Sequence, residues 1–141
     1  MINAIINAVS IALNDEFGDD YAIYSEEVQQ GLKEPCFFIS CINKSNELFL
    51  GRRYFREHMF VVHYFPCNTL NVNEEFNDVA ERLYLCLEWL TVDDDLIRGT
   101  KMRAETVDGI MHFFVNYDVF VYKNSEQEAM DSLSSGISVK G

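Results

Sequence analysis

The dipeptide Asp108-Gly109 constrains this sequence more than any other feature, because alternating apolar and polar residues flank it on both sides. Asp-Gly suits a two-residue type I′ β-turn, in which both turn residues adopt positive φ. A turn of this type pairs Val107 with Ile110 and sets the register of the two strands. The dipeptide therefore predicts an antiparallel β-hairpin whose second strand continues to Tyr122.

The predicted register separates the side chains of this hairpin into a mostly apolar face and a more polar face. The expected pairs on the apolar face are Thr106–Met111, Ala104–Phe113, Met102–Val115 and Thr100–Tyr117. The expected pairs on the other face are Glu105–His112, Arg103–Phe114 and Lys101–Asn116. A slip of one residue would mix the two sets, so the apolar face is expected to pack in the core.

Two segments carry the period of an amphipathic helix. In residues 2–17, apolar side chains recur at spacings of three and four, and Gly18 is expected to end the helix. In residues 73–91, Asn73 is the expected N-cap, and acidic residues follow it in the first turn, where they complement the helix dipole. The buried stripe predicted for this second helix consists of Phe76, Val79, Ala80, Leu83, Leu87 and Leu90.

Three further strands are predicted at residues 21–25, 36–43 and 54–65. The polar residues 44–47 are expected to form a break after the second of these strands. Pro66 limits the third strand, because proline cannot donate a ladder hydrogen bond. This third strand is apolar on both faces, which is typical of a strand that helices or another subunit cover on both sides.

The predicted elements together indicate an α+β fold. We expect a mostly antiparallel sheet of about five strands, with two amphipathic helices packed on it, in the order α-β-β-β-α-β-β. Residues 1–123 are expected to form a single domain. Residues 124–141 are rich in Ser, Glu and Gly and are predicted to be a flexible polar tail.

The charge balance excludes several classes of partner. The chain carries 23 acids and 11 bases, a formal net charge of −12. A generally basic nucleic-acid binder and a protein that docks on anionic membranes both need a surplus of Lys and Arg. The sequence begins without a cationic targeting region and has no apolar run long enough to span a bilayer, so we expect a soluble cytosolic chain. Its cysteines are then expected as reduced thiols, namely Cys36, Cys41, Cys67 and Cys86.

A search for catalytic and metal-binding motifs predicts no enzyme, no cofactor and no metal site. Phosphate-binding loops, the dinucleotide fingerprint, the serine-hydrolase elbow and the zinc-protease helix motif are all absent from the sequence. Cys36 and Cys41 lie five residues apart on a predicted strand, which sends their thiols to opposite faces. The acidic run Asp93–Asp95 is interpreted as a solvated turn after the second helix, and His112 as a cross-strand polar partner of Glu105.

Acidic and basic residues are segregated along the chain. Residues 15–34 hold seven acids and one base, and residues 74–95 hold eight acids and one base. The bases gather near residues 52–56 and 98–103. These runs are either solvated faces or complementary surfaces for head-to-tail association, and the basic residues alternatively face an acidic partner. The candidate interface residues are Arg52, Arg53, Tyr54, Phe55, Arg56, Arg98, Lys101 and Arg103.

Five sequence blocks, in order along residues 1–123, resemble tail-terminator proteins of long-tailed phages and prophages of Gram-positive bacteria. Single blocks such as Gly51-Arg52-Arg53-Tyr54-Phe55 are modest signals, and their order over most of the chain is far more specific. The blocks are Tyr24–Ile39, Gly51–Phe55, His63–Pro66, Leu96–Met102 and Val107–Tyr117.

This resemblance implies a structural protein that is similar to the tail terminator of phage lambda. Such a protein has an α+β fold, assembles as a hexameric ring on the tail tube, stops tube growth and offers a docking surface to the head connector. The implied partners are copies of itself, the tail tube protein and the head-tail connector or neck protein. The implied locations are the host cytoplasm during assembly and then the virion tail or neck. No catalytic residues belong to the family.

Other functions stay open at the level of the sequence. The chain is alternatively another neck or tail-completion component, such as a head-closure protein. It is less well described as a small cytosolic enzyme or metal-binding domain with scattered site residues. An acidic decoy that binds a nucleic-acid-binding protein is a further alternative.

Overall fold

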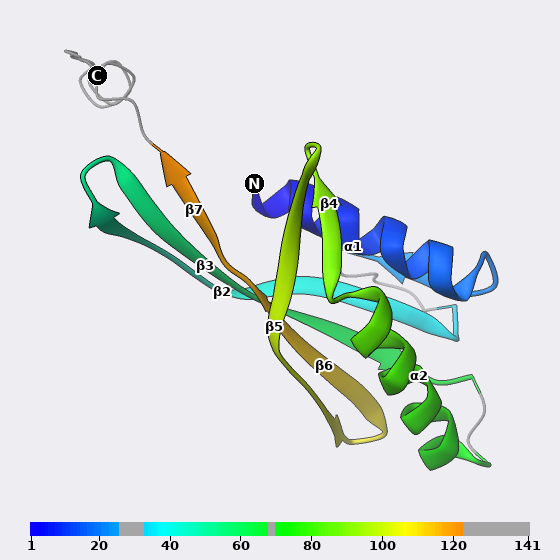
Figure 1. The fold of residues 1–141 in the computed structure, drawn as a ribbon. Helices are drawn as coiled ribbons and strands as arrows, with labels where there is room; N and C mark the ends of the chain where they lie inside the picture. The colour runs from blue at the N-terminus through cyan, green and yellow to red at the C-terminus, as the bar shows by residue number, and fades with distance from the viewer. Residues whose placement is uncertain (26–32, 68–69, 123–141) are drawn as a thin grey trace. The chain divides into compact units, whose positions relative to one another are not determined.

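A computed structural model describes residues 1–25, 33–67 and 70–122 of the chain (Figure 1). Two helices and a seven-stranded, mostly antiparallel sheet confirm the predicted mixed fold, with two strands more than expected. The strand order in the sheet is β1-β2-β3-β6-β5-β4, and β7 pairs with β3. The elements are α1 (Ile2–Phe17), β1 (Ala22–Tyr24), β2 (Cys36–Leu50), β3 (Arg53–Phe65), α2 (Val72–Cys86), β4 (Trp89–Val92), β5 (Asp95–Val107), β6 (Ile110–Tyr117) and β7 (Val119–Tyr122).

The chain divides into two compact units. Unit 1 consists of Met1–Asn43 and His58–Tyr117, and unit 2 of Lys44–Glu57 and Asp118–Gly141. The predicted tail at residues 124–141 lies outside the described residues. The domain boundary at residue 123 therefore stays a prediction.

The core of unit 1 lies between the two helices and one face of the sheet. Both helices bury the stripe that their period predicts, with Ile5, Val9 and Leu13 in α1 and Phe76 and Leu83 in α2. Alternate residues of the central strands complete this core, because successive side chains of a strand point to opposite faces. They are Phe37, Ile39, Phe60, Val62, Tyr64, Met111, Phe113, Val115 and Tyr117.

Helix α1 has the bounds that its periodicity predicts, and it ends at Gly18, whose φ is +88°. Helix α2 differs from the prediction at both ends. It begins at Val72, with Asn71 rather than Asn73 at the N-cap position, and it ends at Cys86 instead of residue 91. Residues Trp89–Val92 form β4, an additional strand.

The pairing of β4 with β5 explains why the second helix is shorter than predicted. Leu90 and Val92 are buried while Trp89 and Thr91 are exposed, which is the two-residue period of a strand. A helix with this spacing would also bury Leu87 and Leu90, so the apolar pattern alone did not distinguish a longer helix from a short strand. The turn that follows β4 contains Asp93 and Asp94, with φ of +50° and +70°. The acidic run is therefore a solvated hairpin turn and does not follow a helix end.

The Asp108-Gly109 hairpin has the predicted turn, with φ of +52° at Asp108 and +75° at Gly109. Val107 pairs with Ile110, and the predicted register holds as far as Arg103 opposite Phe114. Beyond that point the predicted pairs are wrong, because a β-bulge lies between Thr100 and Arg103. The observed pairs there are Thr100–Asn116 and Gly99–Tyr117, and Lys101 has a φ of +53°.

The bulge is explained by the packing around Gly99. A Cβ atom at this position would lie 2.8 Å from the carbonyl oxygen of Leu87 and 2.8 Å from Cγ2 of Val115. The amide of Gly99 donates a 2.6 Å hydrogen bond to the carbonyl of Glu88, and the Tyr117 hydroxyl donates a 2.5 Å bond to the carbonyl of Leu87. The extra residue in β5 changes which side chains face inward, so that Gly99 occupies the tightest place.

Strand β2 is longer than predicted, because the polar residues 44–47 continue the strand instead of breaking it. In unit 2, cross-strand side-chain bonds accompany this polar stretch. Ser45 Oγ donates to Glu57 Oε1 at 3.1 Å, and Arg56 Nε donates to Asn46 Oδ1 at 2.9 Å. A polar strand is therefore stable here without a buried face of its own.

The last predicted strand is divided in two at Asp118. β6 pairs with β5 and β3, whereas β7 pairs only with the first residues of β3, from Arg53 to Arg56. In unit 1, the carbonyl oxygen of Tyr117 lies 3.0 Å from Nδ1 of the buried His58. Since a carbonyl only accepts, this ring nitrogen is the donor.

Candidate interaction surfaces

Three of the predicted interface residues lie on β5 in unit 1. The guanidinium of Arg98 lies 5.7 Å from the Trp89 ring, and its Nη2 lies 3.4 Å from Glu88 Oε2. The guanidinium of Arg103 lies 4.0 Å from the Phe114 ring, and its Nη1 donates to Glu105 Oε1 at 2.6 Å. Lys101 is exposed in the bulge. Exposed ion pairs contribute only about 0–1 kcal/mol, so these cations exchange partners at small cost.

The other five predicted interface residues lie in unit 2, at the β2–β3 turn and the start of β3. The guanidinium of Arg53 lies 5.4 Å from the Phe120 ring of β7, and the ring of Phe55 lies 5.1 Å from that of Phe120. Arg52 is exposed in the turn, and Tyr54 pairs with Val121. The large apolar side chains exposed beside them are Leu48, Leu50 and Phe120.

These two groups share one chemistry, in which an arginine lies over an aromatic ring. The ring partners Trp89, Phe114 and Phe120 were not predicted from the sequence. Phe114 was already opposite Arg103 in the predicted register, so the signal for that pair was present. Trp89 was assigned to a helix, and Phe120 was assigned to the continuation of the second hairpin strand, so neither pairing was apparent from the sequence.

The helix layer of unit 1 is acidic. Arg82 is the one base in residues 74–95, and it bonds to Glu16 of α1 through Nε at 2.9 Å to the carboxylate and through Nη2 at 2.7 Å to the carbonyl. Its guanidinium also lies 4.2 Å from the Phe17 ring. The hydrogen bond to Glu16 is the largest cause that raises the pKa of Arg82. Because Arg82 is paired with Glu16, it does not balance the charge of exposed acids such as Glu74 and Glu81.

The two units differ in charge. Unit 2 holds six bases and six acids, with four of the bases in residues 44–57, so unit 1 carries the net charge of −12. The excess of acids is concentrated in residues 15–34 and 74–95, which both belong to unit 1. One molecule therefore carries an acidic helix layer and basic strands with aromatic residues.

The sheet face of unit 1 that lies opposite the helices is half-buried. Phe38, His63, His112 and Phe114 follow one another across β2, β3 and β6, with ring centroids 6.2, 4.4 and 6.4 Å apart. The sequence predicted that both faces of β3 would be covered. Among the described residues the helices cover one face only, and the side chain of His63 stays partly accessible on the other.

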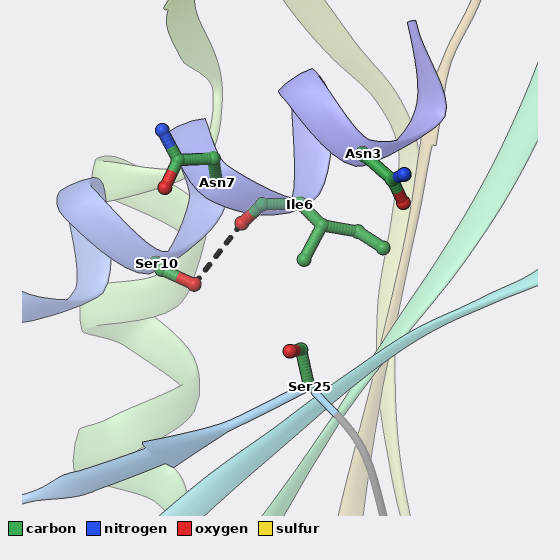
Figure 2. Close-up of a pocket in the computed structure, with 5 residues that line it drawn as sticks. All are labelled: Asn3, Ile6, Asn7, Ser10 and Ser25. Carbon is green, nitrogen blue, oxygen red and sulfur yellow. Dashed lines mark hydrogen bonds between the residues drawn. The ribbon is translucent and has the colours of Figure 1, made fainter.

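A small pocket of about 360 Å³ lies in unit 1 beside α1 (Figure 2). Its lining consists of Asn3, Ile6, Asn7 and Ser10 from α1, with Ser25 after β1. Ser10 Oγ donates a 3.1 Å hydrogen bond to the carbonyl of Ile6. None of these side chains titrates near neutral pH, so they offer polar contacts and no acid–base group.

The cysteines are free thiols in different environments. Cys36 is buried, and this burial, together with Glu34, raises the pKa of its thiol to about 11. Burial raises the pKa of Cys86 to about 12. Cys41 packs against the core while Cys36 lies outside that cluster, as the strand period predicts. In the part of the chain that the structure describes, no three His, Cys, Asp or Glu side chains are grouped to hold a metal ion.

Comparison with known proteins identifies the class. Residues 4–129 match the family model described as phage tail terminator protein, and the chain therefore belongs to that family. Its members are structural proteins that complete phage tails, which places this chain in the virion tail. Within the described residues, no helix is both long and apolar enough to cross a bilayer.

No curated protein matches the chain. Among the solved structures that match, one aligns with 83% of this chain and 94% of its own at 9% identity and a TM-score of 0.38.

Proposed function

We propose that this protein caps the tail tube, stops its elongation and offers a docking surface to the head connector. The family match over residues 4–129 is the observation that carries this proposal. The proposed working domain is residues 1–123. The mechanism is steric, because a protein that occupies the end of the tube denies the next tube subunit its binding site.

Copies of the chain associate head to tail in this proposal. Each copy presents an acidic helix layer and basic strands, so the helix layer of one copy attracts the basic strands of the next. An interface between two different surfaces closes into a ring when the rotation per copy permits, and we propose a hexamer. Cation–aromatic pairs such as Arg103 with Phe114 suit the centre of such an interface, where arginine and aromatic residues are enriched.

Charge reversal on β5 tests this association. The triple variant Arg98→Glu, Lys101→Glu, Arg103→Glu is expected to self-associate less than the unaltered chain while it keeps its melting temperature, because all three side chains are exposed. Light scattering at low and high salt measures the assembly size, and salt should weaken the unaltered assembly. The matched control is Lys44→Glu, an exposed base outside the candidate residues. Unchanged assembly in the triple variant would count against the proposed interface.

A complementary variant tests whether the triple variant associates less because of its reversed charge or because other contacts are lost. Glu74→Lys with Glu81→Lys makes the exposed surface of α2 basic. A mixture of this variant with the triple variant is expected to associate again, since opposite charges then meet across the interface.

The capping role itself is measured on tail tubes assembled from tube protein. Addition of the terminator is expected to narrow the distribution of tube lengths seen by electron microscopy and to label tube ends only. Labelling along the walls, or an unchanged length distribution, would exclude a capping role. Binding to the connector without binding to tube ends would indicate a head-closure protein instead.

A further inference from the structure

The β4–β5 hairpin of unit 1 presents large apolar side chains on the face that points away from the core. Trp89 is directly opposite Arg98, and Thr91 is directly opposite Leu96, so these four side chains project to one face. Trp89 is 51% exposed and Leu96 is 65% exposed. The guanidinium of Arg98 lies over the Trp89 ring, 5.7 Å from its centroid. Tryptophan and arginine are the residue types that most often anchor the centre of a protein interface.

The turn of this hairpin is acidic. Asp93, Asp94 and Asp95 are all exposed. Residues 83–97 hold no base, and Nη2 of Arg98, the first base after them, lies 3.4 Å from Glu88 Oε2. The apolar surface is therefore bounded by carboxylates. A partner that packs on it gains from bases placed beside its own apolar side chains.

The tip of the β2–β3 hairpin in unit 2 has that composition. Leu48 and Leu50 are 61% and 71% exposed, and their spacing of two places them on one face of β2. Arg52 is exposed in the turn, and Arg53 follows it at the start of β3. Residues 44–57 hold four bases and two acids, whereas unit 1 carries a net charge of −12. The chain therefore carries two surfaces that are both apolar and have opposite charge.

We propose that the tip of the β2–β3 hairpin of one copy docks on the β4–β5 hairpin of a second copy. Its two exposed leucines pack against Trp89 and Leu96, and its arginines lie beside the acidic turn at Asp93–Asp95. The two surfaces differ, so each copy offers one and receives the other, and the contact repeats from copy to copy. Because apolar burial contributes to it, this contact depends less on salt than charge attraction alone does.

This inference rests on the proposed head-to-tail association and names an apolar contact within it. If changes at the two leucines leave assembly intact while charge reversal on β5 abolishes it, the docking contact is wrong and the charge-driven association stands. If capping of tubes fails while copies cross-link at these surfaces, the docking contact stands and the capping role is wrong.

Trp89 is the only tryptophan of the chain, so its fluorescence reports directly on this surface. We expect its emission to shift to shorter wavelength, and quenching by acrylamide to decrease, over the concentrations at which light scattering shows assembly. The double variant Leu48→Ser, Leu50→Ser should keep its melting temperature, because both side chains are exposed. It should assemble about tenfold more weakly, without the shift. Val107→Ser, at an exposed apolar position at the other end of β5, is the matched control and should behave as the unaltered chain.

Cross-linking identifies the two surfaces that meet. In a Cys67→Ser background, which removes the exposed thiol, copies with Leu50→Cys are mixed with copies with Leu96→Cys and oxidised. Dimers that contain one copy of each kind should form in higher yield than in a mixture of Leu50→Cys with Val107→Cys. An equal yield, or a disulfide within one chain when both cysteines are placed in the same copy, would overturn the proposal. So would Trp89 emission that stays unchanged on assembly or that shifts only when tube protein is added.

Discussion

Gly99 shows how a single residue decides the packing of unit 1. Its amide bonds to Glu88, and its α-carbon lies against the Tyr117 ring, where a Cβ would be 3.1 Å from Cε1. The Tyr117 hydroxyl in turn donates to the carbonyl of Leu87, the C-cap residue of α2. One glycine thus permits β5, β6 and the end of α2 to meet.

The substitution Gly99→Ala is expected to destabilise the protein by about 1–3 kcal/mol, because the added methyl group overpacks a site bounded by backbone. Urea denaturation followed by circular dichroism measures the change in the free energy of unfolding. Thr100→Ala, at the exposed neighbouring position, is the control and should stay close to the unaltered chain. Equal stability of the two variants would mean that Leu87 and Tyr117 do not crowd Gly99.

The two hairpins of unit 1 show the same turn chemistry at the level of elements. Asp93-Asp94 and Asp108-Gly109 both place two consecutive residues at positive φ, which matches the twist of the flanking strands. Only the second turn contains a glycine, so only that one was recognisable in the sequence. The two aspartates are compatible with this conformation because their short polar side chains tolerate positive φ better than most.

The substitution Gly109→Val is expected to destabilise the β5–β6 hairpin by about 1–2 kcal/mol or more, because a branched side chain is strained at a φ of +75°. Thermal unfolding measures the loss. Nothing lies within 4 Å of a Cβ at this position, so the strain comes from the backbone and not from a clash. Gly109→Asn should therefore recover most of the stability, and an unchanged melting temperature in the valine variant would refute the turn assignment.

Across the whole molecule, burial determines how stability depends on alkaline pH. Burial is the largest cause that raises the pKa of the Cys36 and Cys86 thiols and of the Tyr64 and Tyr117 hydroxyls. The Tyr64 hydroxyl also donates to the Glu75 carboxylate. These groups stay protonated in the folded chain at a pH where the unfolded chain has already lost their protons.

Stability should therefore be complete below about pH 9 and should fall as the pH rises through the unfolded-state pKa values of the thiols and then of the tyrosines. The sign follows because the unfolded state binds fewer protons than the folded state in this range. Urea midpoints between pH 7 and about pH 10 measure the decline. Cys86→Ala should flatten it, whereas Cys67→Ser, at an exposed thiol, should not.

The sequence alone was sufficient to predict the features that depend on neighbours along the chain. The period of α1, the Asp108-Gly109 turn and the register up to Arg103 all follow from local spacing and turn chemistry. The five sequence blocks, taken in order, were sufficient to predict the family, and the match over residues 4–129 confirms it. The candidate interface residues were chosen from the clusters of bases and from the aromatic residues beside them, and their role stays a prediction.

Only the tertiary structure decided the features that depend on distant segments. The end of α2 at Cys86 and the bulge at Lys101 depend on β4, β5 and β6 meeting around Gly99. The pairing of His63 with His112 depends on the register between β3 and β6, which are far apart in sequence. Spacing along a chain reports which residues share a face of one element, whereas the space and the partners available to that face are set by what packs against it.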